Sequence, residues 1–328
     1  MLLGFNIRYD PFALLVLGLL LDALIGDPPW LFKRLLHPVA LMGGFIGWLD
    51  RRFNKAAATP GARRFAGKLV CFANILVAGA VGAVLSWVFA QTVLQFPLEG
   101  ITIALLLSGR GLYDHVAAVA KALEAEGLAA GREAVRHIVG RDPASLDAPG
   151  VARAAIESLA ENFTDGVVAP ALWYAFFGLP GLFAYKALNT ADSMIGHTSK
   201  RYLDFGRATA RLDDLANLLP ARVAGQLFVG AAWLVKGADG GGGYRAMLRD
   251  APKHRSPNAG WTEAAVAGAL NLALNGPRAY GGEVEDDPWM GEGRKEAGSA
   301  DIRRALVLYL HAAGLFTLFA LVSVWLYR

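Results

Sequence analysis

Residues 69–90, with the sequence LVCFANILVAGAVGAVLSWVFA, decide the fold class of this 328-residue chain. The stretch contains no charged residue. A helix rises about 1.5 Å per residue and the hydrocarbon core of a bilayer is about 30 Å thick, so a helix over this stretch is long enough to cross. Residues 69–90 therefore predict a membrane-spanning helix.

Two more stretches resemble it in length and polarity. Residues 166–185 carry no charge, and residues 305–327 contain only His311 as a titratable group that could become positive. Each is long enough to span a bilayer as a helix. The first of them is broken by Pro180-Gly181, which leaves open whether it crosses once or dips into the bilayer and returns.

Two other apolar stretches are less clear. Residues 12–25 are shorter and include Asp22, but Gly26-Asp27-Pro28-Pro29 follows in place of a small-residue cleavage pattern, which favours an uncleaved first helix over a signal peptide. Residues 215–235 are interrupted by Pro220 and Arg222. This stretch fits a span, a kinked span or a hairpin.

The composition and the charge pattern agree with membrane insertion. Hydrophobic residues make up 55% of the chain and charged residues 18%, with a net charge of +4. Several basic residues lie between 50 and 68, whereas 91–100 contains none, so the positive-inside rule places the first loop in the cytoplasm and the second outside. The basic residues need no nucleic acid to explain them. The single cysteine, Cys71, excludes an internal disulfide and a cysteine-cluster metal site.

Polar sequence occupies residues 109–164 and 236–304. Apolar residues in the first of these regions recur at helical spacing, and no strand-like alternation of useful length occurs in the chain. We therefore predict an all-α, polytopic integral membrane protein with about four to six membrane helices, some of them re-entrant. Residues 1–328 are expected to form a single membrane-embedded domain with polar helical insertions at 109–164 and 236–304.

The first group of candidate site residues is Glu157, Glu161 and Asp165 in ESLAENFTD. A spacing of four puts the three carboxylates on one helical face. Oxygen-rich groups of this kind suit Mg²⁺, which takes one or two carboxylates together with phosphate oxygens and water. The alternative is a solvated acidic helix face. The position at the mouth of an apolar stretch argues for a role, because charge beside hydrocarbon is costly.

The second group follows the apolar stretch 166–185. Lys186, Asn189 and Asp192 recur at spacings of three, which gives a polar stripe on a helix, and Arg207, Arg211 and Asp213 come after them. The alternative is interfacial anchoring by basic side chains that snorkel to the lipid headgroups. Anchoring explains the neighbouring pair Lys200-Arg201, but it does not explain Asn189 and Asp192.

Two smaller groups complete the set. Asp27 and His37, in DALIGDPPW and HPVALMGG, are expected near one membrane face, although His37 before Pro38 also fits a simple turn contact. Asn258 lies in KHRSPNAG, where Ser256-Pro257 fits a helix N-cap with proline in the first position. A basic run at a helix amino terminus is alternatively an anion site.

Taken in order, these segments resemble the adenosylcobinamide-phosphate synthase family, also called CobD or CbiB. The resemblance covers nearly the whole chain. It rests on DALIGDPPW with HPVALMG, on GRD followed by ESLAENFTDGVVAPALWYAFFGLPG, on YKALNTADSMIGH with RYLDFGRATARLDDLANLLPAR, and on SPNAGWTEAAVAGAL. The long central string is the most specific part. The chain has no phosphate loop of the GxxxxGK[ST] type, no GxSxG elbow and no HExxH helix.

The resemblance implies an ATP-dependent ligase of cobalamin biosynthesis that joins adenosylcobyric acid to aminopropanol or its phosphate, with Mg²⁺ as metal. We assign metal and base work to Glu157, Glu161, Asp165 and Asp192, with Glu161 and Asp165 as the metal ligands. The residues assigned to substrate binding are Asp27, His37, Lys186, Asn189, Arg207, Arg211, Asp213 and Asn258. The expected partners are the corrinoid, the amino alcohol, the lipid bilayer of the plasma membrane and other membrane enzymes of the pathway. The active site is expected on the cytoplasmic side.

Two other functions fit parts of the sequence. A transporter would use intramembrane Lys186, Asn189 and Asp192 beside the Pro-Gly break as an ion or substrate pathway. A membrane-bound sensor or scaffold would use the polar insertions as partner surfaces. Neither accounts for the full ordered set of motifs.

Overall fold

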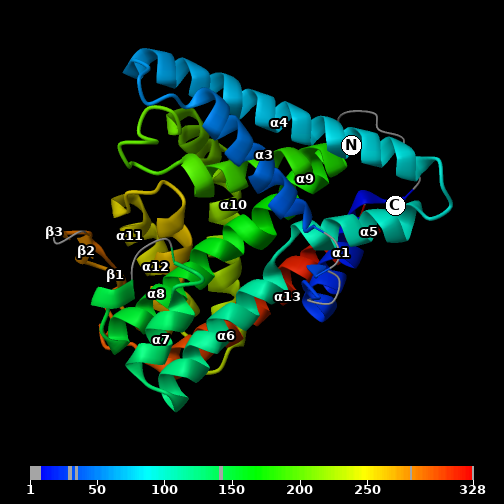
Figure 1. The fold of residues 1–328 in the computed structure, drawn as a ribbon. Coiled ribbons are helices and arrows are strands. Elements are labelled where there is room, and N and C mark those ends of the chain that lie inside the picture. The colour runs from blue at the N-terminus through cyan, green and yellow to red at the C-terminus, as the bar shows by residue number, and fades with distance from the viewer. Residues whose placement is uncertain (1–8, 29–31, 34–35, 140–142, 281–282, 327–328) are drawn as a thin grey trace. The chain divides into compact units, whose positions relative to one another are not determined.

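The structure is a computed structural model that describes residues 9–28, 32–33, 36–139, 143–280 and 283–326 (Figure 1). The motif residues Pro29, Trp30, Gly140, Arg141 and Asp142 lie outside this part. The chain divides into two compact units. Unit 1 comprises Met1–Ser108, Ala169–Asn217 and Ala320–Arg328, and unit 2 comprises Gly109–Val168 and Leu218–Phe319. The expectation of one membrane-embedded domain stays a prediction.

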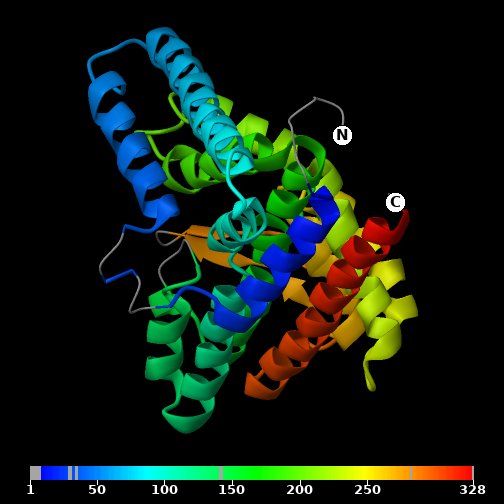
Figure 2. The same ribbon diagram turned by 90° about the vertical axis from the view of Figure 1, so that its right-hand side faces the viewer.

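Unit 1 is built from helices whose starts are marked in the sequence. Its elements are α1 (Pro11–Ile25), α3 (Pro38–Phe53), α4 (Pro60–Ala90), α5 (Gln95–Leu106), α9 (Ala169–Ile195) and the first part of α10 (Arg207–Leu234). A capping side chain followed by proline begins three of them, the caps being Asp10, His37 and Thr59. Figure 2 shows α3 and α4 side by side, joined by a short turn.

Helix α9 breaks at Gly178, which has left-handed backbone angles (φ 67°, ψ −155°) two residues before Pro180. The ring centroids of Trp173 and Tyr185 are 6.4 Å apart. A straight helix would rise roughly 18 Å between these two positions, so the chain turns sharply at Gly178. The break that the sequence predicts at Pro180-Gly181 is present, but the residue that absorbs it is Gly178. Only glycine adopts such angles readily.

Unit 2 contains helices and two small sheets. The helices are α6 (Gly109–Ala125), α7 (Leu128–Val135), η1 (Pro143–Ser145), α8 (Ala148–Phe163), the π-helical turn η2 (Thr164–Val168), α11 (Gly240–Asp250), η3 (Ala251–Lys253), α12 (Ala259–Leu270) and most of α13 (Ser299–Leu326). The antiparallel strand pairs are β1 (Leu274–Asn275) with β4 (Trp289–Met290), and β2 (Arg278–Tyr280) with β3 (Glu283–Glu285). In the first pair, Leu274 lies opposite Met290.

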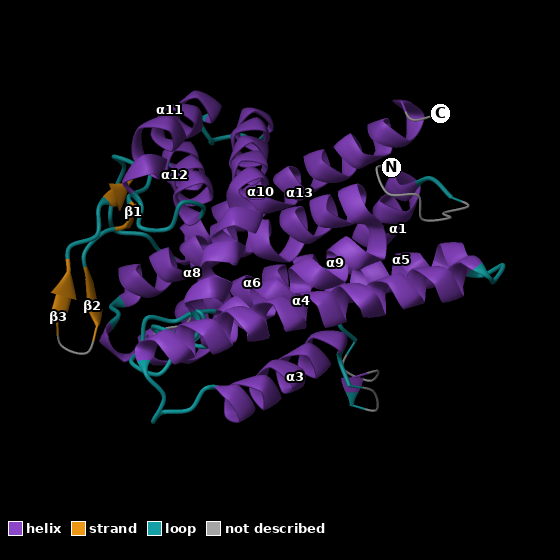
Figure 3. Ribbon diagram, turned by 90° about the horizontal axis from the view of Figure 1, so that it is seen from above, coloured by secondary structure: helices purple, strands orange, loops and turns teal. Residues whose placement is uncertain are grey.

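These strands correct one expectation. The second polar insertion, 236–304, is predicted to be helical, whereas Figure 3 shows orange strands in it among the purple helices. Strands of two or three residues are too short for an alternating pattern to show in the sequence. The other regular elements of the described chain are helices, as predicted.

Three helical segments are long and apolar enough to cross a membrane: Pro60–Ala90, Ala148–Ile195 and Ser299–Leu326. They contain the three stretches identified above, and α1 adds a shorter apolar helix. The chain is therefore an integral membrane protein by length and composition of its helices. Helix α10 runs unbroken through Pro220 and is not among the candidate spans of the described chain. The number of crossings stays a prediction.

Asp250 joins three parts of unit 2 and gives a test of this fold. Its buried carboxylate accepts hydrogen bonds from Arg249 at 2.6 and 2.8 Å, from Lys253 at 2.8 Å and from the amide of Gly291 at 2.9 Å. Burial alone would raise the pKa of Asp250, but these hydrogen bonds hold it well below its usual range. Asp250 therefore contributes stability at neutral pH that is lost as the pH falls below about 4.

We expect Asp250→Asn to lower the free energy of unfolding by about 1–3 kcal/mol, because the two cations and one amide lose a charged acceptor. Thermal unfolding in detergent at pH 7 measures this change. Asp239, whose side chain is 62% exposed and 3.6 Å from Arg245, is the matched control. Asp239→Asn should change stability by less than about 1 kcal/mol. Equal effects of the two substitutions would contradict the role of Asp250.

Candidate functional site

The loop 196–206 connects α9 to α10 and is fixed to α3 and α4 by polar contacts. Asp50 of α3 forms an ion pair with Arg201 at 2.6 Å and accepts a hydrogen bond from Asn54 Nδ2 at 2.8 Å. Asn54 Nδ2 also donates to the carbonyl of Arg201 at 3.2 Å. Arg64 of α4 pairs with Asp204 at 2.6 Å. These contacts hold the loop at its middle and near its end. Arg201 therefore has an ion-pair partner within the protein, in addition to any role at the membrane interface.

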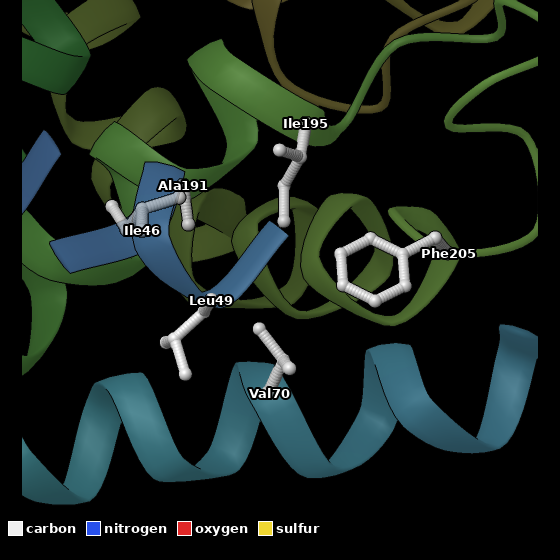
Figure 4. Packing of buried hydrophobic residues seen from close by; sticks show 6 residues of the cluster. All are labelled: Ile46, Leu49, Val70, Ala191, Ile195 and Phe205. Atoms are coloured by element: carbon white, nitrogen blue, oxygen red, sulfur yellow. The ribbon is translucent and has the colours of Figure 1, made fainter. Parts of the chain in front are cut away.

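An apolar cluster supports the same loop. Ile46, Leu49, Val70, Ala191, Ile195 and Phe205 pack together from α3, α4, α9 and the loop (Figure 4). Phe205 is fully buried. A Cβ on Gly67 would lie 1.9 Å from the carbonyl oxygen of Phe205, and a Cβ on Gly206 would lie 1.7 Å from that of Ile195. Glycine at both positions thus permits backbone contact that positions the start of α10.

A cavity of about 320 Å³ opens beside this loop. Its lining includes Arg207 and Arg211, two of the predicted substrate-binding residues, which lie one turn apart on α10. The charged lining is completed by Arg64, His197 and Asp204. Arg207 and Arg211 are exposed and form no ion pair with a described residue. The cavity is therefore lined with positive charge.

A network of buried polar side chains lies on α9 and α10. Asp213 accepts hydrogen bonds from Asn217 Nδ2 at 3.0 Å and from Asn189 Nδ2 at 3.4 Å, and Tyr185 donates to Asn217 Oδ1 at 2.9 Å. Asp213 is 8% exposed and Asn217 is 2% exposed. The structure thus brings together Asn189 and Asp213, which the sequence predicted to be site residues.

Asp192 lies between this network and the cavity. A Cβ on Gly196, which lines the cavity, would be 2.0 Å from Asp192 Oδ1. Asp192 also acts electrostatically on Asp213. Asp192 is half-buried, and it precedes the lining residue Gly196 by four residues. The arrangement gives an acid pair next to a basic pocket.

Burial, and then the charge of Asp192, raise the pKa of Asp213 to about 7 from 3.8. The folded protein consequently holds a proton on Asp213 between about pH 4 and pH 7, where the unfolded chain does not. The free energy of unfolding must therefore fall as the pH rises through this window. We expect Asp213→Asn to remove this decline, which thermal unfolding in detergent at pH 5 and pH 8 would show. An unchanged slope in the variant would rule out Asp213 as its source.

The remaining predicted residues of unit 1 have different surroundings. Lys186 is buried in α9. His37 Nε2 lies 3.2 Å from Asp27 Oδ1, and His37 Nδ1 accepts the amide of Val39 at 3.2 Å as the N-cap of α3. The amide fixes the neutral ring with its proton on Nε2, facing Asp27. His37 thus caps α3, where the sequence suggested a simple turn contact as the alternative, and it also lies against Asp27.

Glu157, Glu161 and Asp165 lie in unit 2, where α8 passes into the π-helical turn η2. Glu157 is 6% exposed and accepts the amide of Asn275 at 2.7 Å, so it anchors strand β1. Glu161 is exposed and Asp165, inside η2, is half-buried. A π turn adds a residue to the helical ring and shifts the face that follows it, which a simple spacing of four does not anticipate.

Asn258 precedes α12, also in unit 2. Ser256 Oγ accepts the amides of Asn258 and Ala259, both at 3.2 Å, as a capping residue does. The helix itself begins at Ala259, two residues after Pro257. Asn258 is 8% exposed.

Sequence reasoning missed several polar residues. His197 and Arg64 line the basic cavity, although neither stands out by spacing. Glu99 is fully buried in α5, where it accepts a hydrogen bond from Tyr174 at 2.9 Å and contacts Gln95 Nε2 at 3.4 Å. A lone acid inside the apolar sequence of α5 was the available signal, because such residues are rare without a partner.

Comparisons with known proteins agree over the length of the chain. A family model described as CobD/Cbib protein matches residues 15–309. The cobalamin biosynthesis protein CobD of Rhizobium meliloti is 50% identical over 307 residues, which cover 93% of this chain and 94% of that protein. The protein of the same name from Brucella suis is 49% identical over 315 residues (92% and 94%), and that from Rhodobacter capsulatus is 45% identical over 320 residues (95% and 97%). No solved structure matches this chain.

Proposed function

Because this chain belongs to the CobD/CbiB family of cobalamin biosynthesis proteins, we propose that it is an ATP-dependent amide synthase of that pathway. Its substrates are adenosylcobyric acid and aminopropanol or aminopropanol phosphate. The product is adenosylcobinamide or its phosphate. It acts in the plasma membrane with its active site toward the cytoplasm, where the basic sequence at 50–68 lies under the positive-inside rule.

The observation that carries the proposal is the basic cavity with the carboxyl group of Asp192 beside its lining residue Gly196. Arg207 and Arg211 line a pocket next to Asp192 and Asp213. Cations that bind phosphate or carboxylate are needed to activate a carboxyl group, and a base is needed to receive the proton of the attacking amine.

The proposed reaction has two steps. A carboxylate oxygen of the corrinoid attacks the terminal phosphorus of ATP, and ADP leaves. The uncharged amine then attacks the acyl carbon, the amide bond forms, and phosphate departs with the carboxylate oxygen. Asp192 takes the proton that the amine nitrogen gives up. Asp213, held by two asparagines, acts through Asp192 as a positioning residue.

The predicted ligands suit Mg²⁺ only when nucleotide phosphates also bind the ion. Among the described residues, no group of three or more histidine, cysteine, aspartate or glutamate side chains gathers as a metal cage. Glu161 and Asp165 lie four residues apart where α8 passes into η2, and Mg²⁺ on nucleotide phosphates commonly takes one or two protein carboxylates. We therefore propose that these two residues hold the ion. When bound, it neutralises phosphoryl charge.

Nucleotide consumption tests the proposal. Purified protein with ATP and Mg²⁺ should release no ADP without cobyric acid, about one equivalent of ADP with cobyric acid alone, and ADP continuously when an amine is also present, because only the amine consumes the acyl phosphate of the first step. Protein sealed in vesicles serves as the comparison. Net movement of corrinoid across the vesicle membrane, with no ADP released under any combination, would favour a transporter and reject the synthase.

A further inference from the structure

We propose that the cavity lined by Arg64, His197, Arg207 and Arg211 binds the dianion of a phosphate monoester. The inference rests on the proposed function and deepens it, since the cations of this cavity could bind either the phosphate or the carboxylate of a substrate. It also adds Arg64 and His197 to the ligands. The phosphate belongs either to the amino alcohol or to the nucleotide, and the experiment below separates these sources.

The charge of the lining favours a dianion. The charge of Arg64 is already balanced by Asp204, with which it forms an ion pair at 2.6 Å. Arg207 and Arg211 form no ion pair with a described residue, so two guanidinium groups of the lining have no carboxylate bound to them. A carboxylate would neutralise one of them, whereas a phosphate monoester near pH 7 neutralises nearly both. Planar guanidinium groups also bind phosphate oxygens in pairs.

The backbone around the cavity also favours an anionic ligand. Helix α10 begins at Arg207, so its amino-terminal amides carry partial positive charge at the cavity wall. The close approach of Gly206 to Ile195 and the Asp50–Arg201 pair fix the loop that leads into this helix. Fixed donors lose little freedom when an anion binds, which raises affinity.

The size of the cavity limits the ligand. A volume of about 320 Å³ is at the lower end of the range of ligand pockets, about 300–1,000 Å³. Such a space accepts a small phosphate ester or a single terminal phosphoryl group. It does not enclose a whole nucleotide.

Phosphorus NMR of the solubilised protein tests the site directly, without turnover. Inorganic phosphate, aminopropanol phosphate and ATP are titrated at constant salt into the unaltered protein, Arg211→Gln and Lys200→Gln. Lys200 is the matched control, because it is an exposed base of the same loop that does not line the cavity. Arg211→Gln should weaken phosphate binding at least about tenfold, and Lys200→Gln should leave it within about twofold.

The organic ligands identify the source of the phosphate. A parallel loss of aminopropanol phosphate affinity in Arg211→Gln, with ATP unaffected, supports the amine ester as ligand. A loss of ATP affinity supports the terminal phosphate of the nucleotide. Thermal unfolding confirms that each variant is folded, which we expect since Arg211 has no ion pair within the described chain.

Equal effects of Arg211→Gln and Lys200→Gln, or no effect of either, would overturn the inference. Its failure is distinct from failure of the proposed function. If the protein forms the amide but its phosphate binding does not depend on Arg211, only the assignment of the cavity is wrong. Phosphate binding that depends on Arg211 in a protein that forms no amide removes only the reaction.

Discussion

Asp192→Asn should reduce the rate of amide formation by about 10²–10⁴-fold, the contribution typical of a positioned general base. The substitution keeps the size of the side chain but cannot accept the proton that the amine loses. Asp192 Oδ1 lies beside Gly196 at the cavity rim, where that amine would be held. The measurement is the initial rate of amide formation at saturating ATP, with protein amount normalised by the folded fraction.

Asp114→Asn is the control for this prediction. Asp114 is a solvent-exposed acid of α6 that pairs with Arg110 at 2.9 Å, and we expect its replacement to change the rate by less than about twofold. Glu161→Gln should act like Asp192→Asn if Glu161 holds Mg²⁺. Full activity of Asp192→Asn would remove the assignment of Asp192 as base.

Gly206→Ala should prevent correct packing of the loop 196–206 and lower the yield of folded protein strongly. The new Cβ would lie 1.7 Å from the carbonyl oxygen of Ile195, which is backbone and cannot rotate away. Gly67→Ala should have a similar effect through the carbonyl of Phe205 at 1.9 Å. Overpacking of this kind typically costs about 1–3 kcal/mol, and more where backbone must move. Thermal unfolding of detergent-solubilised protein measures the loss.

Gly61→Ala is the matched control, because it lies on α4, as Gly67 does, and an added Cβ meets no atom within 4 Å. Alanine is the better helix former, so this substitution should leave stability unchanged or raise it by up to about 1 kcal/mol. If Gly67→Ala and Gly206→Ala were as stable as Gly61→Ala, the close backbone contacts of the loop would be wrong.

The membrane helices could be predicted because their signals are long and local. Residues 69–90 and 305–327 lack charge over the length of a bilayer, and the structure places candidate spans over both. The start of α12 was also visible, because Ser256 before Pro257 fits a helix cap and Ser256 Oγ accepts the amides of Asn258 and Ala259. The strands in 236–304 could not be predicted, because pairs such as Leu274 with Met290 depend on contacts between residues distant in sequence.

Part of the candidate site could also be predicted, because its signal is local in the sequence. Spacing placed Asn189 on a polar stripe and Asp213 was named among the charged residues that follow it, and the structure joins the two by a hydrogen bond at 3.4 Å. The cavity could not be predicted from the sequence, because it forms where Arg64 of α4 lies near the loop that contains His197. Glu157 looked like a metal ligand by spacing, yet its hydrogen bond to Asn275 is made over 118 residues of sequence. The metal role of Glu161 and Asp165 stays a prediction.

The most direct test of carboxyl activation follows an oxygen atom. Cobyric acid labelled with heavy oxygen in the reacting carboxylate is incubated with the purified protein, ATP, Mg²⁺ and aminopropanol or its phosphate. The masses of the products are then measured by mass spectrometry. We expect the coupled corrinoid amide together with one labelled oxygen in the released inorganic phosphate. An amide formed without label in the phosphate, or no amide with either amine, would contradict it.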